Sequence, residues 1–434
     1  MTYPRWFVAT ILAVLLAVLP MTASANSVDD WNGIAGTAMF VNITPIPGGA
    51  PAAINFAYLN AAIYDAVNAI DGHYSVFAIH PRAGTVTAGA SIDAATAAAA
   101  YTILRALFPS QAGATGYLTT SYNTYLAGIP NGTAKDRGVT LGTEIATDFL
   151  ASRAGDGRGN AAVTYTFQAP GPGVYQLTPG APAPPATPAT PWVAVMRPFA
   201  INSPSQFRAD GPPDLTSAQW AEDYNEVKDF GALNGSLRTP EQTNIGLFYT
   251  EPPGPYGLRG IRRAAAEQGL NTIDSARFFA QTYVTLADSF IGCWDSKYYY
   301  NFWRPVTAIR AVGANEDGND ATEPDPAWTP LGTTPGHQEY PSAHGCFTGA
   351  VSYAFDEFFG TKKITLHFDV QAVPGHPELN GTVHTFKNTQ EMRKEVIEGR
   401  IFGGIHYRTS VVHGLVLSHK VSHWVAKHYF LPVE

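Results

Sequence analysis

The sequence of 434 residues contains little cysteine and little charge. Its two cysteines exclude a disulfide-dense scaffold and any cysteine-rich zinc or iron–sulfur site. Lysine and arginine total 27 against 35 acidic residues, a net charge of -8, which argues against binding nucleic acid or an anionic membrane surface. Hydrophobic residues make up 45% of the chain and charged residues 14%, so most of it should be ordered. The composition indicates a large, mildly acidic globular protein.

Long apolar runs are also scarce. The exception is residues 6–19, which follow Arg5 and end at Pro20. This run is shorter than the roughly 20 residues that cross a bilayer, and small residues at 23–25 offer a cleavage site. The pattern predicts a signal peptide over residues 1–25 and export to the periplasm or the cell exterior, with an uncleaved anchor as the alternative. No later segment reads as a membrane span.

Hydrophobic residues recur at helical spacing in several segments, whereas the alternation typical of strands is weak. Between residues 56 and 70 they form the stripe of an amphipathic helix, which Gly72 should end. Further helices are predicted over residues 92–107, 136–151, 218–230 and 273–295. The fold class is therefore mainly α.

The length exceeds the roughly 250–300 residues at which single cores usually stop growing, so two packed halves or one very large domain is expected. Residues 168–192 are rich in proline and glycine and suit an extended surface connection rather than a helix. We therefore predict an N-terminal helical half over 26–167, a proline-rich crossover over 168–192 and a C-terminal helical half over 193–434.

Three short segments of the C-terminal half concentrate positive charge beside small residues. Lys297, Arg304 and Arg400 are donors to an anion, and an arginine can hold two oxygens of an oxyanion at once. Ser342 adds a hydroxyl, and its small neighbours let backbone N–H groups approach the same anion. Taken singly, such segments are more typical of a solvated face, a helix cap or a loop.

Two histidines, His344 and His406, complete this set. One can attack or coordinate a central atom while the other moves a proton at neutral pH. The combination suits a tetrahedral oxyanion that passes through a five-coordinate state, either phosphate or its structural analogue vanadate.

In this order the segments resemble a known family. The motifs are Lys297-x6-Arg304-Pro305, Pro341-Ser342-Ala343-His344 and Arg400-x5-His406. They are similar to the three-part signature of the vanadium-dependent haloperoxidases and the type 2 phosphatidic acid phosphatase superfamily. Residues 61–70 and 323–328 also look like the bacterial exported haloperoxidases. The resemblance implies a helix-bundle architecture of the haloperoxidase and acid phosphatase type, with long loops and an oxyanion site between helices.

The resemblance also implies roles for individual residues. His406 would ligate vanadium, His344 would be the acid–base group, and Lys297 would polarise hydrogen peroxide. The implied vanadate- or phosphate-binding positions are Lys297, Arg304, Ser342, Ala343 through its backbone N–H, and Arg400.

The implied activity is vanadate-dependent oxidation of a halide by hydrogen peroxide. Hypohalous acid would leave and halogenate a small organic acceptor. Trp294 resembles the residue near the lysine in chloride-oxidising fungal enzymes, and His337 occupies a position where algal bromoperoxidases have histidine. The two residues form a possible halide pocket, which favours bromide and iodide, although His337 could equally be an exposed loop histidine.

Two other functions are compatible with these motifs. An exported acid phosphatase would use the same site without a metal, through a phosphohistidine at His406. A non-catalytic anion-binding protein that keeps the fold is a third possibility, which the presence of both histidines and all three cations disfavours.

Two features leave alternatives open. Many relatives carry an aspartate four residues after the ligating histidine, where it fixes the imidazole ring; this chain has Ser410. The orienting group is therefore weaker or comes from elsewhere. Cys293 and Cys346 each lie close to a motif, and they form either a disulfide or two buried thiols.

Overall fold

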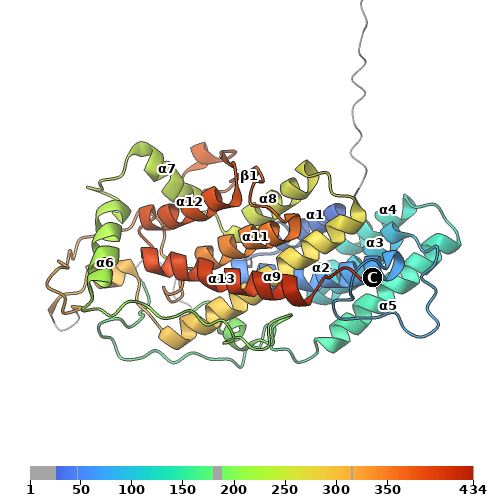
Figure 1. Ribbon diagram of the computed structural model, residues 1–434, viewed down its shortest axis with the longest axis horizontal. Helices are drawn as coiled ribbons and strands as arrows, with labels where there is room; N and C mark the ends of the chain where they lie inside the picture. The colour runs from blue at the N-terminus through green and yellow to red at the C-terminus, as the bar shows by residue number, and fades with distance from the viewer. Residues whose placement is uncertain (1–25, 46, 179–187, 314–315, 434) are drawn as a thin grey trace, which may run out of the picture.

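The computed structural model describes residues 26–45, 47–178, 188–313 and 316–433 (Figure 1). The predicted signal peptide, residues 1–25, lies outside the described residues. Within the described ranges no helix is both long and apolar enough to cross a membrane.

Helices dominate the described residues, which confirms the predicted fold class. In chain order the helices are α1 (Ser27–Phe40), α2 (Gly49–Asp71), α3 (Ile92–Leu107), η1 (Pro109–Gln111), α4 (Tyr117–Ala127), α5 (Thr133–Ser152), η2 (Pro191–Val195), α6 (Ala218–Gly231), α7 (Pro240–Phe248), α8 (Pro253–Glu267), α9 (Thr272–Tyr300), α10 (Pro305–Ile309), α11 (Ala343–Phe359), η4 (Pro377–Leu379), α12 (Thr389–Phe402) and α13 (Arg408–His428). Strands β1 (Leu366–Asp369) and β2 (Val383–Phe386) pair antiparallel, with Leu366 opposite Phe386.

All five helices predicted from hydrophobic spacing occur, as α2, α3, α5, α6 and α9. Gly72 ends α2 in the left-handed conformation, with φ of 79°, as its position predicted. Helix α9 ends at Tyr300, five residues later than predicted. It ends there because Asn301 adopts the left-handed conformation, with φ of 50°, and caps the helix. The extension places Lys297 in the last turn of a buried helix rather than in a loop.

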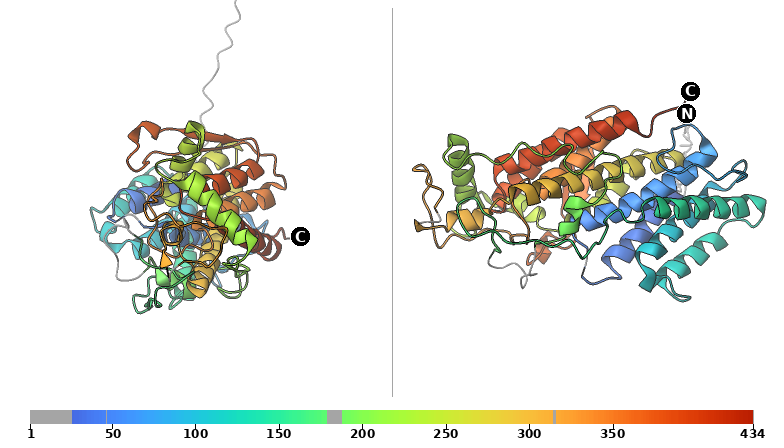
Figure 2. Two further views of the ribbon diagram at one scale, coloured as in Figure 1. Left: turned by 90° about the vertical axis from the view of Figure 1, so that its left-hand side faces the viewer. Right: turned by 90° about the horizontal axis from the view of Figure 1, so that it is seen from below.

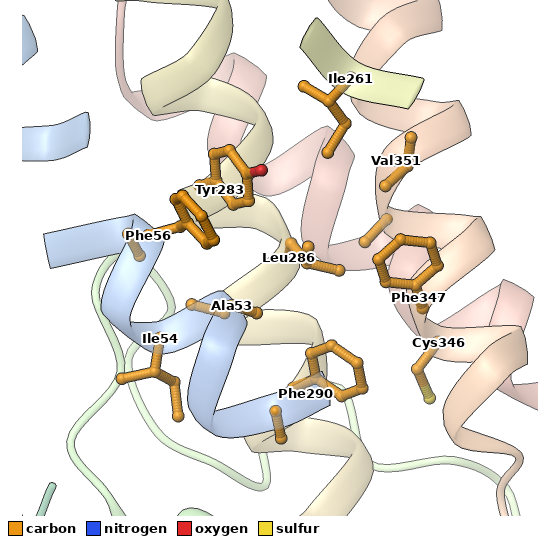
Figure 3. Packing of buried hydrophobic residues seen from close by; sticks show 14 of the residues in the cluster. Ala53, Ile54, Phe56, Ile261, Tyr283, Leu286, Phe290, Cys346, Phe347 and Val351 are labelled. Atoms are coloured by element: carbon orange, nitrogen blue, oxygen red, sulfur yellow. The ribbon is translucent and has the colours of Figure 1, made fainter. Parts of the chain in front are cut away.

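The long helices α9, α11 and α13 lie side by side along the molecule, and α2 packs against α9 (Figures 1 and 2). Helices α3, α4 and α5 gather at one end of the long axis, and α6, α7 and α12 at the other. Figure 3 shows the core between them, where α2, α8, α9 and α11 meet. Phe56 on α2 stacks on Tyr283 of α9 with ring centroids 4.7 Å apart. This core fixes α9, which carries one of the three motifs.

Helices α11 and α13 approach each other closely through glycines. A Cβ on Gly345 would lie 2.5 Å from the carbonyl oxygen of Val411, and one on Gly414 would lie 2.8 Å from that of Ser342. Only glycine permits this spacing. Cys293 of α9 and Cys346 of α11 form a disulfide, which settles the alternative left open by the sequence. The second motif is thus tied to both neighbouring helices.

The described parts of the proline-rich segment, residues 168–178 and 188–192, contain no α-helix, as predicted. They do not all lie on the surface, however. Tyr175 is fully buried, and its N–H donates to the carbonyl oxygen of Asn301 at 2.8 Å. The proline-rich segment is therefore tied to the C-terminal end of α9 through Tyr175.

Asp65 of α2 holds the chain that follows this helix. Its buried carboxylate accepts hydrogen bonds from the N–H groups of Phe77 (2.7 Å), Ala78 (3.0 Å) and Ile79 (2.9 Å). We expect Asp65→Ala to lower stability by about 2–4 kcal/mol, because three N–H groups lose a charged partner. Urea unfolding followed by circular dichroism measures this. The exposed control Asp320→Ala should stay within about 0.5 kcal/mol of wild type, and an equally small effect at Asp65 would contradict the assignment.

Candidate active site

The three motifs meet where the end of α9, the start of α11 and the junction of α12 with α13 come together. Their side chains are buried: the exposed fraction is 0% for Lys297 and Ser342, 1% for Arg400 and His406, and 8% for His344. Residues that are distant in sequence thus form one cluster in the interior.

Local sequence explains how two of these segments are shaped. Ser342 is the N-cap of α11, and its hydroxyl accepts from the N–H of Gly345 at 3.4 Å. The first turn of α11, which starts at Ala343, therefore presents the positive end of a 17-residue helix. Gly404 has φ of 72°, and a Cβ there would lie 2.4 Å from the carbonyl oxygen of Gly231. This glycine allows the tight turn that brings His406 to the cluster.

His406 has a defined hydrogen-bonding state. Its Nδ1 lies 2.7 Å from Oε1 of Glu339, and its Nε2 lies 3.0 Å from Nη1 of Arg304. Because a guanidinium can only donate, Nε2 accepts, and the proton of the neutral ring sits on Nδ1. Burial lowers the pKa of His406 well below its usual range, and the charge of Arg304 lowers it further. The Nε2 lone pair is therefore kept available.

Glu339 is a site residue that sequence reasoning missed. Its carboxylate is fully buried and also accepts from the N–H of Tyr407 at 3.1 Å. Burial raises the pKa of Glu339 to about 7, although the charges of Arg304 and Lys297 lower it. Ser410 makes only a long 3.5 Å contact from its hydroxyl to the Glu339 carbonyl. The orienting group thus comes from elsewhere, and the available signal was an acidic residue three positions before Ser342.

Lys297 supports the segment that precedes α11. Its ammonium donates to the carbonyl oxygens of Gln338 (2.8 Å), Glu339 (3.0 Å) and Pro341. Burial lowers the pKa of Lys297 well below its usual value, and Arg304 lowers it further. All three N–H donors are engaged, so contact with an oxyanion would require one of them to exchange its partner. The role predicted for Lys297 in peroxide activation stays a prediction.

Arg304 joins three segments of the site. Besides His406, it donates to the carbonyl oxygens of His337 (3.0 Å) and Ile405 (2.8 Å), and Nη2 lies 3.1 Å from Nδ1 of His337. Burial lowers the pKa of Arg304 to about 10. The guanidinium fixes both the ring of His406 and the loop that carries His337.

Arg400 and His344 each have a buried polar atom that makes no hydrogen bond to the described residues. Nη1 of Arg400 donates to the carbonyl oxygen of Tyr249 at 2.5 Å, whereas its Nε finds no partner among the described residues. The buried Nε2 of His344 likewise finds none there. Burial lowers the pKa of Arg400 to about 9 and that of His344 well below its usual range. Because Arg400 and His344 both line one cavity, these two atoms are available to a ligand there.

These atoms border a cavity of about 380 Å³. Among the predicted site residues, the cavity lining contains Trp294, His337, Ala343, His344, Arg400 and His406. Lys297, Arg304 and Ser342 are not part of that lining and support it from behind. The cluster buries three cations beside one carboxylate, Glu339, so a bound anion would offset the surplus positive charge. The donor set fits a tetrahedral oxyanion.

Trp294 and His337 face each other across 5.3 Å between ring centroids. The Trp294 indole donates to Oγ1 of Thr190 at 3.1 Å and to the carbonyl oxygen of Ala189 at 3.2 Å. His337 is half-buried in the cavity wall rather than a fully exposed loop residue. The two residues predicted to form a halide pocket therefore lie together beside the cationic cluster.

The fold and the site define a helical-bundle protein with a buried cationic cavity that fits a tetrahedral oxyanion. Residues 277–433 match the family model of the VCPO second helical-bundle domain. The vanadium chloroperoxidase of Curvularia inaequalis is 30% identical over 187 residues, which cover 35% of this chain and 29% of that enzyme. The chain thus spans under a third of that curated relative. The resemblance to the vanadium haloperoxidases recognised from the three motifs is thus confirmed over residues 277–433, the part of the chain that carries those motifs.

Two solved structures share the fold over nearly the whole chain. The first bacterial vanadium-dependent iodoperoxidase superposes with a TM-score of 0.77 at 22% identity, covering 96% of this chain and 99% of that one. A holo-type bacterial vanadium-dependent chloroperoxidase gives a TM-score of 0.66 at 17% identity, covering 91% and 95%. At these identities the likeness establishes the fold.

Proposed function

We propose that the protein is a vanadate-dependent haloperoxidase that oxidises a halide with hydrogen peroxide and forms hypohalous acid. The observation that carries this proposal is the state of His406, whose Nδ1–H is held by Glu339 while Nε2 keeps its lone pair beside a cationic cavity. The bacterial iodoperoxidase and chloroperoxidase that share the fold support it.

The residues present fit vanadate as the cofactor. His406 would hold it through Nε2, which requires Nη1 of Arg304 to turn from that nitrogen to an oxyanion oxygen. Arg400 and the first-turn N–H groups of α11 would bind further oxygens. When bound, vanadate supplies a Lewis acid that activates hydrogen peroxide.

His344 is the proton carrier in this proposal. It is neutral at pH 7, because burial lowers its pKa, and its unpartnered Nε2 belongs to a residue of the cavity lining. Nε2 can accept a proton from hydrogen peroxide as the peroxide enters and return it to a leaving oxygen. Trp294 and His337 lie together in the cavity lining, and their rings favour the larger, weakly hydrated halides. Bromide and iodide are therefore the proposed substrates.

The competing function is hydrolysis of phosphate monoesters, which is favoured by one observation: the same Nε2 lone pair could act as a nucleophile. Purified protein should be assayed for iodide, bromide and chloride oxidation with and without added orthovanadate. Phosphate monoester hydrolysis should be measured on the same sample. The proposal expects vanadate-stimulated oxidation with little hydrolysis. Hydrolysis that vanadate inhibits, without halide oxidation, would make the protein a phosphatase.

Lys297→Ala should reduce halide oxidation by about 10–100-fold and weaken vanadate binding, because the carbonyls of residues 338, 339 and 341 lose the ammonium that holds them. Steady-state kinetics and equilibrium binding measure the two effects, and circular dichroism checks the fold. The control is Lys420→Ala, an exposed lysine on α13. An unchanged rate together with an unchanged vanadate affinity in Lys297→Ala would show that the lysine has no part in the site.

We also propose that the chain is exported. The apolar run at residues 6–19 and the disulfide between Cys293 and Cys346, a bond typical of oxidising compartments, support this. Protein expressed in its source cells should be recovered from the periplasm or the medium, and N-terminal sequencing should find it starting near Asn26. Recovery from the cytoplasm with residues 1–25 attached would contradict the proposal.

A further inference from the structure

The segment from Glu339 to Ser342 carries two groups of the site, the carboxylate that holds His406 and the N-cap of α11. On one side, carbonyl oxygens of this segment accept from the ammonium of Lys297. Tyr340 lies between the two groups in sequence, and its side chain is buried. The contacts of this side chain therefore bear on how the whole segment is held.

The Tyr340 hydroxyl has two hydrogen-bond partners among the described residues. It accepts from the N–H of Gly211 at 2.9 Å and lies 2.5 Å from Nδ1 of His413. Because a backbone N–H can only donate, the single hydroxyl proton is left for Nδ1 of His413. Burial lowers the pKa of His413, although the charge of Asp210 raises it, so the ring is neutral at pH 7 and Nδ1 can accept. Tyr340 therefore joins the loop at Gly211 to α13.

Aromatic neighbours hold the ring of Tyr340. It meets the ring of Tyr300 edge-on, with centroids 5.4 Å apart, and the ring of His413 at 5.7 Å. Tyr300 is itself fixed, because its hydroxyl donates to the carbonyl oxygen of Ala209 at 2.7 Å. A displacement of Tyr340 would thus break two aromatic contacts as well as two hydrogen bonds.

The start of α13 binds the same segment at three points. The N–H of Tyr407 donates to the Glu339 carboxylate at 3.1 Å, and the carbonyl oxygen of Ser410 accepts from the N–H of Ser342 at 3.0 Å. His413 adds the third contact, to the tyrosine hydroxyl. These helix positions are three residues apart and so lie on one side of the helix. The segment is therefore fixed to α13 along its length, and the contact with His413 is the one made between two side chains.

We propose that Tyr340 and His413 are positioning residues of the oxyanion site. Their hydrogen bond ties the segment that carries Glu339 to α13, and His406 lies two residues before this helix. Without it, the Glu339 carboxylate is free to move away from Nδ1 of His406, and oxyanion binding weakens. Neither residue belongs to the cavity lining, so both act through Glu339. The effect on halide oxidation rests on the proposed function, whereas the effect on oxyanion binding does not.

Equilibrium dialysis of orthovanadate against the full chain, without halide or peroxide, tests this inference. Tyr340→Phe removes only the hydroxyl, and we expect its Kd for orthovanadate to rise about 10-fold with an unchanged circular dichroism spectrum. His413→Leu should raise the Kd by a similar factor. The double variant should bind about as tightly as Tyr340→Phe alone, because both substitutions remove the same hydrogen bond. His413→Asn should recover most of the affinity, since its amide oxygen can accept from the Tyr340 hydroxyl.

The matched control is Tyr64→Phe on α2. Tyr64 is also buried, its hydroxyl donates to the carbonyl oxygen of Ser75 at 2.7 Å, and it is not part of the cavity lining. This variant should keep the wild-type affinity for orthovanadate. Wild-type affinity in Tyr340→Phe would overturn the inference, and so would equal affinities of His413→Leu and His413→Asn. Absence of orthovanadate binding to wild type would overturn it together with the proposed function. Binding that depends on Tyr340, without oxidation of any halide, would refute the proposed function alone.

Discussion

His406→Ala is expected to lower both halide oxidation and any phosphate monoester hydrolysis by about 1,000-fold or more. Either reaction needs the Nε2 lone pair, which no other group at this position supplies. Far-UV circular dichroism should be unchanged, because the ring contributes to a cavity wall rather than to the hydrophobic core. Equilibrium binding of orthovanadate should be lost in parallel.

The matched control is His423→Ala, a half-exposed histidine on α13 that pairs with Glu357 at 3.2 Å. It should retain wild-type activity and vanadate affinity. Full activity in His406→Ala would remove the basis of both enzymatic functions, because both depend on the same nitrogen.

Glu339→Gln is expected to reduce vanadate affinity and activity by about 10–100-fold. The amide keeps the shape of the side chain but removes the charge that fixes the proton on Nδ1 of His406. Its NH2 group can also donate to Nδ1, which would move the ring proton to Nε2 and block the lone pair. Vanadate binding and steady-state kinetics measure the loss. Glu378→Gln, an exposed carboxylate that also pairs with a histidine, is the control.

A second substitution separates orientation from simple packing. Ser410 stands where many relatives carry an aspartate, and it is buried next to the carbonyl of Glu339. Adding Ser410→Asp to Glu339→Gln should recover part of the lost affinity, because a carboxylate returns beside the imidazole. Unchanged affinity in the single variant Glu339→Gln would show that the carboxylate does not orient His406.

Hydrophobic spacing predicted five helices because each shows one apolar face and recognisable stop residues. The extension of α9 to Tyr300 was not predicted, since the left-handed cap at Asn301 depends on its tertiary setting. The hairpin of β1 and β2 has strands of four residues each, too short for alternation to stand out.

The motifs predicted which side chains cluster, but not which of them line the cavity and which support it from behind. Spacing could not show that Lys297 is saturated by three carbonyls or that Arg304 lies behind the cavity wall. Glu339 could not be assigned to His406, because the two are 67 positions apart and meet only through the packing of α11 against α13. Contacts between residues so far apart in sequence form only when the helices pack, so the sequence alone does not reveal them.

A vanadate titration tests the proposed activity most directly. The purified, phosphate-free protein is titrated with orthovanadate, and bromide oxidation is measured at saturating hydrogen peroxide. Activity should be absent at the start, rise with added vanadate and saturate at about one equivalent per chain, because a single His406 holds one oxyanion. Inorganic phosphate should compete, since it fits the same cationic cavity. Bromide oxidation that is independent of vanadate, or no oxidation of any halide at saturating vanadate, would contradict the proposed function.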